Sequence, residues 1–140
     1  MKKAENFAAN TGIKLAGMWT TLMLLYIYCD IYSFHRTGYI NEMIAGKIGP
    51  FEVRQGLLAV FGILMAIPAL MVTACLFLKP EINRWINIVA GILYTAVNVG
   101  NLVGETWTYY WIYGVIEIII TVLIVVMAAR ITSSHHTPHL

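Results

Sequence analysis

The chain has 140 residues, of which 59% are hydrophobic and 11% are charged, and its mean hydropathy is +0.73. Soluble domains average about half apolar and a quarter charged residues, so this composition excludes an ordinary soluble protein and indicates an integral membrane protein in contact with a lipid bilayer. The net charge of +2 gives no sign of a surface that binds nucleic acid.

Four apolar stretches are each long enough to cross a bilayer as a helix, which takes about 20 residues. Residues 1–14 are expected to form a short charged tail before the first stretch, and residues 131–140 a polar tail after the last. The pattern predicts an all-α, integral membrane four-helix bundle in a single transmembrane domain, 1–140. Its spans are predicted at about residues 15–34, 50–78, 81–103 and 106–129.

The only long connection, residues 33–49, has apolar residues at helical spacing with polar residues between them. This periodicity favours a short amphipathic helix that lies in the membrane interface between spans one and two. The alternative is a loop packed over the bundle. The apolar positions are Ile40, Met43, Ile44 and Ile48.

The second span is predicted to begin at Gly49-Pro50, because proline suits the first position of a helix. Glu52 then lies in a first turn, where the helix dipole favours an acidic side chain. Pro68 lies near the middle of this span. It predicts a kink and leaves the carbonyl group of Leu64 without its usual helical donor.

Short turns join the last three spans. Lys79-Pro80-Glu81 predicts a tight antiparallel hairpin between spans two and three, and Thr106 is the expected N-cap of span four. Aromatic residues of the kind that form a belt at a membrane interface crowd the start of span four. They are Trp107, Tyr109, Tyr110, Trp111 and Tyr113.

The placement of Lys and Arg predicts the orientation of the spans. With the N-terminus inside, six of these residues lie in cytoplasmic segments and three in outer segments. The positive-inside rule therefore favours cytoplasmic N- and C-termini, in the inner or plasma membrane of a prokaryote.

Span four carries one charged residue, Glu117, near its middle. A helix rises about 1.5 Å per residue, which places this carboxyl group near the midplane of a hydrocarbon layer about 30 Å thick. Because a charge at that depth costs a few kcal/mol, we expect the group to be protonated and received by other spans. Counting from the turn at 104–106, the expected hydrogen-bond partners are Asn98, Tyr94 or the carbonyl group of Leu64.

Each of the other spans also has a polar or small-residue stripe at helical spacing, and these stripes are most simply packed inward. The candidate ligand-binding residues are Glu117, Asn98, Asn101, Tyr94, Tyr113 and Asp30. Two structural readings stand beside this one. Buried Asn and Glu side chains often only hold membrane helices together, above all at Asn87 and Asn101, and Asp30 is expected to form an interfacial ion pair with Arg54.

The sequence disfavours several kinds of redox, cofactor and hydrolytic site. Cys29 and Cys75 lie near opposite ends of their spans, roughly 20 Å or more apart by helix rise, which is too far for a disulfide. No histidine lies within a span to hold a haem, and no phosphate-binding loop, nucleophile elbow or zinc-ligand spacing is present. We therefore expect no cofactor and no metal.

Three passages carry a family resemblance: Tyr26-Ile27-Tyr28-Cys29-Asp30, the run from Asn83 to Gly91, and Ile116-Glu117-Ile118. Over about residues 15–130 the chain resembles an uncharacterised family of small four-span prokaryotic membrane proteins, a domain of unknown function. Its span count and layout are more distantly similar to DoxX-like four-helix proteins. Neither resemblance implies an activity or a catalytic residue.

Three functions of different classes remain open. The first is binding or transport of a small hydrophobic molecule or an ion at the bundle centre around Glu117. Since a four-span chain is small for a complete transport path, this function predicts a homo-oligomer. The second is an accessory or structural subunit that packs against a membrane-protein partner. The third is a membrane enzyme acting on a lipid or quinone with Asp30 and Glu105, although no particular reaction is indicated.

Overall fold

The structure is a computed structural model that describes the backbone of residues 2–131 and the side chains of residues 10–131. Four long helices and one short helix make up most of it, and a two-stranded hairpin follows the short helix. In chain order the elements are α1 (Lys2–Ser33), α2 (Tyr39–Ile44), β1 (Lys47–Ile48), β2 (Phe51–Glu52), α3 (Gln55–Phe77), α4 (Pro80–Leu102) and α5 (Thr108–Ala129).

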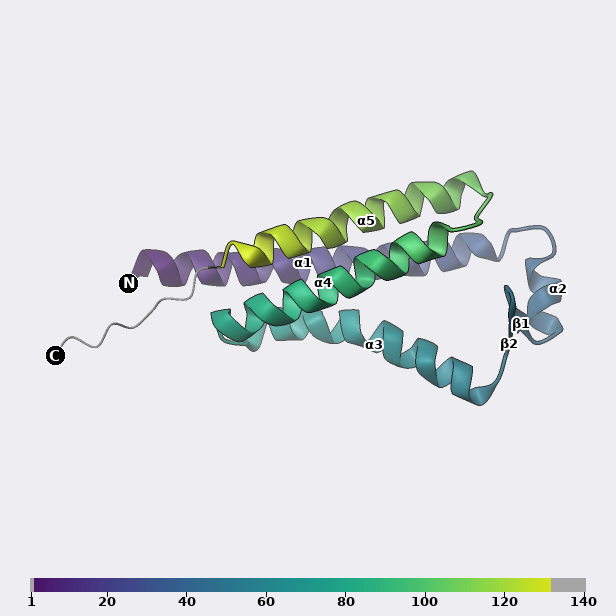
Figure 1. Ribbon diagram of the computed structural model, residues 1–140, viewed down its shortest axis with the longest axis horizontal. Helices are drawn as coiled ribbons and strands as arrows, with labels where there is room; N and C mark the ends of the chain where they lie inside the picture. Colours follow the sequence, from purple (N-terminus) through teal and green to yellow (C-terminus); the bar gives the residue numbers. More distant parts are fainter. Residues whose placement is uncertain (1, 132–140) are drawn as a thin grey trace.

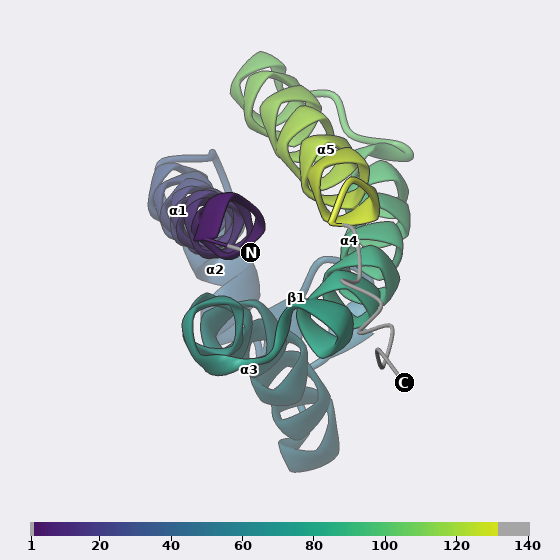
Figure 2. The same ribbon diagram turned by 90° about the vertical axis from the view of Figure 1, so that its left-hand side faces the viewer.

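The four long helices form a bundle in which each runs antiparallel to the next along the chain (Figure 1). Helix α1 packs along α3 on one side and α5 on the other, and α4 packs along α5 (Figure 2). Contacts between α3 and α4 are few in comparison. The α3–α4 connection lies at the end of the bundle where α1 begins, whereas α2 and the hairpin lie at the opposite end, which we call the α2 end. The predicted four-helix bundle with a short helix between the first two spans is confirmed.

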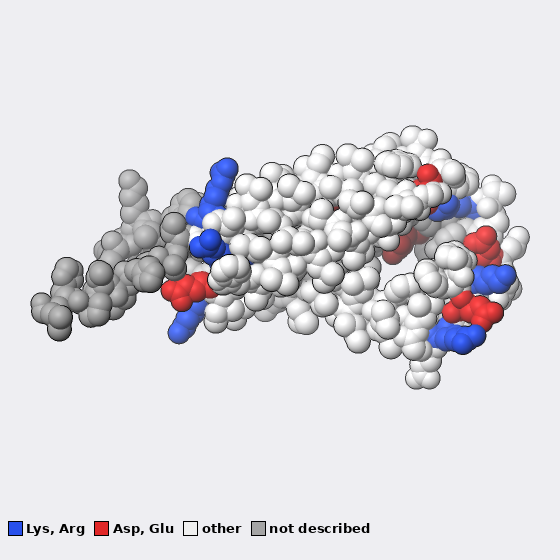
Figure 3. All heavy atoms as spheres, in the orientation of Figure 1, with Lys and Arg blue, Asp and Glu red and all other residues white. Residues whose placement is uncertain are grey.

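All four long helices are long and apolar enough to span a membrane, with mean hydropathies of 1.3 to 2.6 over their best windows. Figure 3 shows the matching charge distribution on one face: Lys, Arg, Asp and Glu gather at two ends, and an apolar band separates them. The candidate spans are residues 10–33, 55–77, 80–102 and 108–129.

The prediction that Pro50 begins a helix is wrong. Gly49 and Pro50 instead form the turn of the β1–β2 hairpin, in which Ile48 pairs with Phe51. Gly49 has a φ of 54°, and a glycine with positive φ at the first central position suits the tight turn between two antiparallel strands. Helix α3 therefore starts at Gln55, and Glu52 lies in a strand rather than in a first helical turn.

Two further boundaries differ from expectation. Helix α1 begins at Lys2, so the backbone predicted to form a charged tail extends the first helix. Helix α5 begins at Thr108 with Trp107 at the N-cap and no capping side chain, so Thr106 is not the N-cap. The expected tail after the last span lies outside the described residues from 132 onward. The predicted helix between spans one and two is present as α2, and none of its residues is buried.

An ion pair ties the two connections together at the α2 end. The Arg36 guanidinium, just after α1, donates two hydrogen bonds to the Glu105 carboxylate at 2.9 and 3.1 Å. The same carboxylate accepts the backbone N–H groups of Thr106 and Trp107 at 2.8 and 3.0 Å, and the guanidinium lies 5.1 Å from the centre of the Trp107 ring. Glu105 therefore joins the segment after α1 to the turn that leads into α5.

The charge of Glu105 makes this contact pH-dependent. Burial alone would raise the pKa of Glu105, but the N–H groups of Trp107 and Thr106 and the Arg36 guanidinium together lower it below the usual 4.5. Because the folded-state pKa is depressed, the stabilisation is fully present above about pH 4.5 and is lost as the pH falls through the lowered pKa.

Replacing Glu105 with glutamine is expected to lower the free energy of unfolding at pH 7 by about 1–2 kcal/mol, because charge-assisted hydrogen bonds are lost. The difference between variant and wild type should shrink as the pH falls below about 4.5, where the wild type also loses the charge. Unfolding of the detergent-solubilised protein across pH 3–7 tests this. Glu52→Gln, which removes a solvent-exposed ion pair, is the control and should change little. A difference that stays constant with pH would contradict the assignment.

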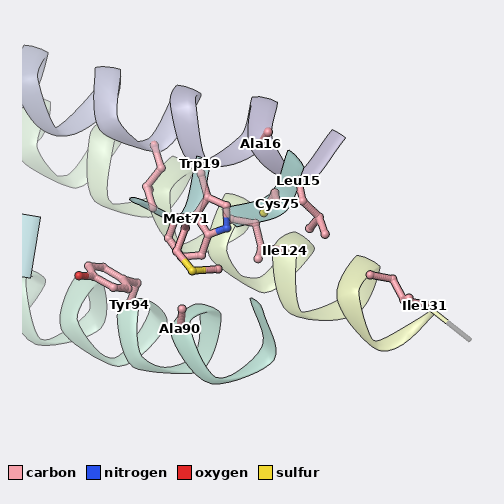
Figure 4. Packing of buried hydrophobic residues seen from close by; sticks show 10 residues of the cluster. Leu15, Ala16, Trp19, Met71, Cys75, Ala90, Tyr94, Ile124 and Ile131 are labelled. Atoms are coloured by element: carbon pink, nitrogen blue, oxygen red, sulfur yellow. The ribbon is translucent and has the colours of Figure 1, made fainter. Parts of the chain in front are cut away.

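The core lies toward the end opposite α2 and is centred on Trp19 of α1. In Figure 4, Trp19 is surrounded by Met71 and Cys75 of α3 and Ile124 of α5, with Tyr94 of α4 on the facing side. Trp19 and Tyr94 are fully buried and meet edge to face, with ring centres 5.7 Å apart. The two cysteines are free, as predicted.

A polar network inside this core joins three helices, and we call it the asparagine network: Trp19, Cys75, Asn83 and Asn87. The Asn87 side-chain oxygen accepts the indole N–H of Trp19 at 2.7 Å and the thiol of Cys75 at 3.3 Å. Its amide nitrogen donates to the backbone and side-chain oxygens of Asn83 at 2.8 and 2.6 Å. Asn83 in turn donates to the carbonyl group of Cys75 at 3.0 Å. These contacts agree with the structural reading of Asn87, in which its side chain holds membrane helices together.

Candidate functional site

The bend predicted at Pro68 has a definite consequence in α3. Proline has no N–H, so the Leu64 carbonyl group loses its helical donor, and the Tyr94 hydroxyl group of α4 donates to it instead. The part of α3 before this point diverges from the bundle in both views (Figures 1 and 2). None of residues 55–66 is buried. The Tyr94 contact is thus a tether between α4 and the diverging half of α3.

A cavity of about 70 Å³ lies beside this tether, and we call it the Glu117 cavity. Figure 3 shows the face of the molecule hollowed between α3 and α4 near the α2 end, with acidic atoms on the inner wall. Four helices contribute to the cavity. Its lining residues are Tyr26, Cys29 and Asp30 of α1, Met65 of α3, Tyr94, Val97 and Asn101 of α4, and Tyr110 and Glu117 of α5.

The Glu117 side chain is buried and has no hydrogen-bond partner in the part of the chain that the structure describes. The residue is 6% exposed, and its Oε1 atom is a buried acceptor without a donor among the described residues. The expected hydrogen bonds to Asn98, Tyr94 or the Leu64 carbonyl group are therefore absent, since Tyr94 takes that carbonyl itself. The nearby Asn98 is fully buried, and its Nδ2 atom is also unpaired. Two unpaired polar atoms contrast with the fully bonded asparagine network in the core.

Two of the three phenol groups at the cavity donate their hydroxyl hydrogens to protein oxygens, and the third, that of Tyr110, has no acceptor among the described residues. Tyr26 donates its hydroxyl hydrogen to the Asn98 side-chain oxygen at 2.8 Å, and Tyr94 donates to Leu64. Each hydroxyl oxygen keeps lone pairs that accept hydrogen bonds. With the carboxyl groups of Asp30 and Glu117, the cavity wall presents several acceptors, and its donors are neutral groups such as the Tyr110 hydroxyl group.

Four of the six predicted site residues, Glu117, Asp30, Asn101 and Tyr94, line the cavity together. The fifth, Asn98, is not in the lining, and its side-chain oxygen accepts the hydroxyl hydrogen of Tyr26. The sixth lies elsewhere: Tyr113 packs against Tyr32 of α1, with ring centres 6.1 Å apart.

Five lining residues are not among the predicted site residues: Tyr26, Cys29, Met65, Val97 and Tyr110. A signal for two of them was available. Tyr26 lies four residues before Asp30, and Tyr110 lies seven residues before Glu117, which are both spacings that keep side chains on one face of a helix.

The expected ion pair between Asp30 and Arg54 is not formed. Arg54 lies just before α3 and pairs with Glu52 at 2.8 Å, where both side chains are largely exposed. The β1–β2 hairpin accounts for this difference, because Glu52 at its end is only two residues from Arg54. Asp30 is exposed and stands at the cavity without a cationic partner among the described residues.

The two outer carboxyl groups suggested for enzyme chemistry belong to different places. Asp30 lines the Glu117 cavity, whereas Glu105 is bound to Arg36 and borders a separate cavity of about 310 Å³ under α2. General acid–base catalysis by Asp30 and Glu105 acting as a pair is therefore disfavoured. Within residues 10–131, no group of three or more His, Cys, Asp or Glu side chains is placed to hold a metal ion.

These features define the chain as a bundle of four helices of membrane-spanning length with a small acidic cavity near the α2 end. A family model matches residues 2–137, and the chain accordingly belongs to the family of unknown function DUF6326. The match includes the ends of the chain that lay outside the resemblance over residues 15–130, and it lends no support to the DoxX-like likeness. Neither the curated proteins nor the solved structures contain a significant match to this chain.

Proposed function

We propose that this protein is a multi-pass membrane protein that binds a small molecule or ion in the Glu117 cavity. The observation that supports this most is the buried carboxyl group of Glu117, which lines a cavity and has an unpaired oxygen atom. An ionisable side chain at membrane depth is costly, so one left without a protein partner favours a ligand that completes it.

The proposal includes an arrangement in the membrane. The excess of Lys and Arg at the end where α1 begins favours cytoplasmic termini, and the α2 end then faces outward. A homo-oligomer is proposed if the protein transports its ligand, because four helices enclose little more than one small cavity. If the protein is instead an accessory subunit, Glu117 only helps the helices to pack, and no discrete ligand binds in the cavity.

Native mass spectrometry of the gently solubilised protein tests the proposal. We expect the wild type to carry a discrete non-lipid adduct that Glu117→Gln loses, because glutamine keeps the shape of the side chain and removes its charge. Glu52→Gln is the matched control, since it removes an exposed carboxyl group outside the cavity and should retain the adduct. Bare monomers in all three samples would contradict the proposal and favour an accessory protein whose partner was removed.

A further inference from the structure

The lining of the Glu117 cavity is acidic, which restricts the ligands that suit it. The hydroxyl hydrogens of Tyr26 and Tyr94 are donated to protein oxygens. Of the described lining residues, two carry carboxyl groups and none is Lys, Arg or His. An anion would therefore meet two carboxyl groups and no basic side chain, with only neutral donors such as the Tyr110 hydroxyl group and the Asn101 amide nitrogen. A cation would instead meet carboxylate, amide and phenol oxygens.

The size of the cavity limits the cation. Drug-sized ligands occupy pockets of about 300–1,000 Å³, whereas a single water needs about 10–15 Å³, and this cavity has about 70 Å³. The space therefore fits an alkali metal ion with a few waters or a small ammonium ion. A divalent transition metal is disfavoured, since no cluster of three ligating side chains lies within the described residues.

The two carboxyl groups at the cavity differ in exposure. Asp30 is exposed, whereas Glu117 is 6% exposed, and neither has a cationic partner within residues 10–131. Burying an isolated carboxylate costs far more than burying the neutral acid, so an empty site favours a protonated Glu117. A cation that enters next to Glu117 removes this cost, because the carboxylate and the cation together are neutral.

We propose that the Glu117 cavity binds one small monovalent cation in exchange for the proton of Glu117, with Asp30 attracting the cation at the exposed side. The proton leaves to bulk water, so charge inside the cavity is unchanged. This inference rests on the proposed function of the cavity and names its ligand class. The titratable groups facing the site are Tyr26, Cys29 and Asp30 from α1, Tyr94 from α4 and Tyr110 from α5, while α3 contributes only Met65.

The exchange is tested by measuring cation binding and proton release together. Purified protein in weakly buffered detergent solution is titrated with NaCl, KCl or methylammonium chloride between pH 5 and 9, with N-methylglucamine chloride, too large for the cavity, as the ionic-strength control. We expect about one proton released per cation bound wherever Glu117 is protonated. In that range the Kd of the cation should fall about tenfold for each unit by which the pH rises, since one proton is exchanged for one ion. Comparison of the three salts distinguishes an alkali metal site from an ammonium site.

Three variants separate the roles of the carboxyl groups. Glu117→Gln should abolish proton release and weaken binding by at least about tenfold, because the charge that faces the cation is gone. Asp30→Asn should weaken binding by about two- to tenfold and keep the release of one proton per cation. Glu52→Gln should match the wild type. The conservative Glu117→Asp should keep proton release, because it retains a carboxyl group at this position, whereas a site that needs only the packing of the side chain would not distinguish the two variants in this way.

The outcomes separate this inference from the proposed function. Cation binding without proton release, or with a pH-independent Kd, would overturn the exchange and leave the proposed ligand site standing. Absence of cation binding, while native mass spectrometry still shows an adduct that depends on Glu117, would overturn the cation and again leave the site standing. Absence of both would overturn the proposed function itself.

Discussion

Replacing Asn87 with leucine is expected to lower the free energy of unfolding by about 2–4 kcal/mol. Asn87 is fully buried and is the centre of the asparagine network. Its side-chain oxygen accepts the indole N–H of Trp19, and its amide nitrogen donates to two oxygens of Asn83. Leucine has a similar size but no polar atom, so a buried N–H group and two acceptor sites lose their partner at once. A typical interhelical hydrogen bond in a membrane is worth only about 0.6 kcal/mol, and the larger effect comes from these unpaired groups.

Unfolding of the solubilised protein by a denaturing detergent measures this effect. A double-mutant cycle with Trp19→Phe provides the control, because phenylalanine removes the N–H donor that Asn87→Leu leaves unpaired. The double variant should therefore be destabilised by less than the sum of the single variants. Strict additivity would mean that the bond between Trp19 and Asn87 contributes nothing specific.

Replacing Gly12 with alanine is expected to lower the free energy of unfolding by about 1–3 kcal/mol. A Cβ atom at this position would lie 2.6 Å from the Cys75 carbonyl oxygen, which belongs to the backbone of α3. A backbone atom cannot move aside by changing rotamer as a side chain can, so α1 and α3 must move apart at this contact. The movement also disturbs the hydrogen bond from Asn83 to the same carbonyl group.

The neighbouring Gly17 provides a matched control in the same helix. A Cβ atom there would meet nothing within 4 Å, and alanine favours a helix over glycine by up to about 1 kcal/mol. Gly17→Ala is therefore expected to leave stability unchanged or raise it slightly, while Gly12→Ala lowers it. Thermal unfolding of both variants in one detergent compares them directly. Equal stability of the two would show that α1 and α3 do not depend on this close contact.

The orientation of α5 shows where sequence reasoning reaches its limit. Spacings of three and four residues both keep side chains on one helical face, so Tyr110, Tyr113 and Glu117 are compatible with a single stripe. Packing decides between Tyr110 and Tyr113. Gly114 lies against the Leu102 side chain of α4, which turns Tyr110 toward the cavity and leaves Tyr113 to pack against α1.

The hairpin before α3 shows a second limit. Proline after glycine is typical of a helix start and equally of a tight turn, and the local sequence cannot rank the two. The positive φ of Gly49 and the pairing of the flanking strands settle the choice in the folded chain. As a result Arg54 is held close to Glu52, and Asp30 loses the ion-pair partner that the sequence suggested.

The sequence by itself determined the class of this protein, because long apolar runs and the turns between them specify helices of membrane-spanning length irrespective of how they pack. It also identified the costly carboxyl group of Glu117 and the free carbonyl group at Leu64, since both follow from local chemistry. Only the tertiary structure decided which groups meet. Tyr94 reaches the carbonyl group, and Glu117 is left facing a cavity, because the rotation of each helix and the divergence of α3 depend on contacts between residues far apart in the chain.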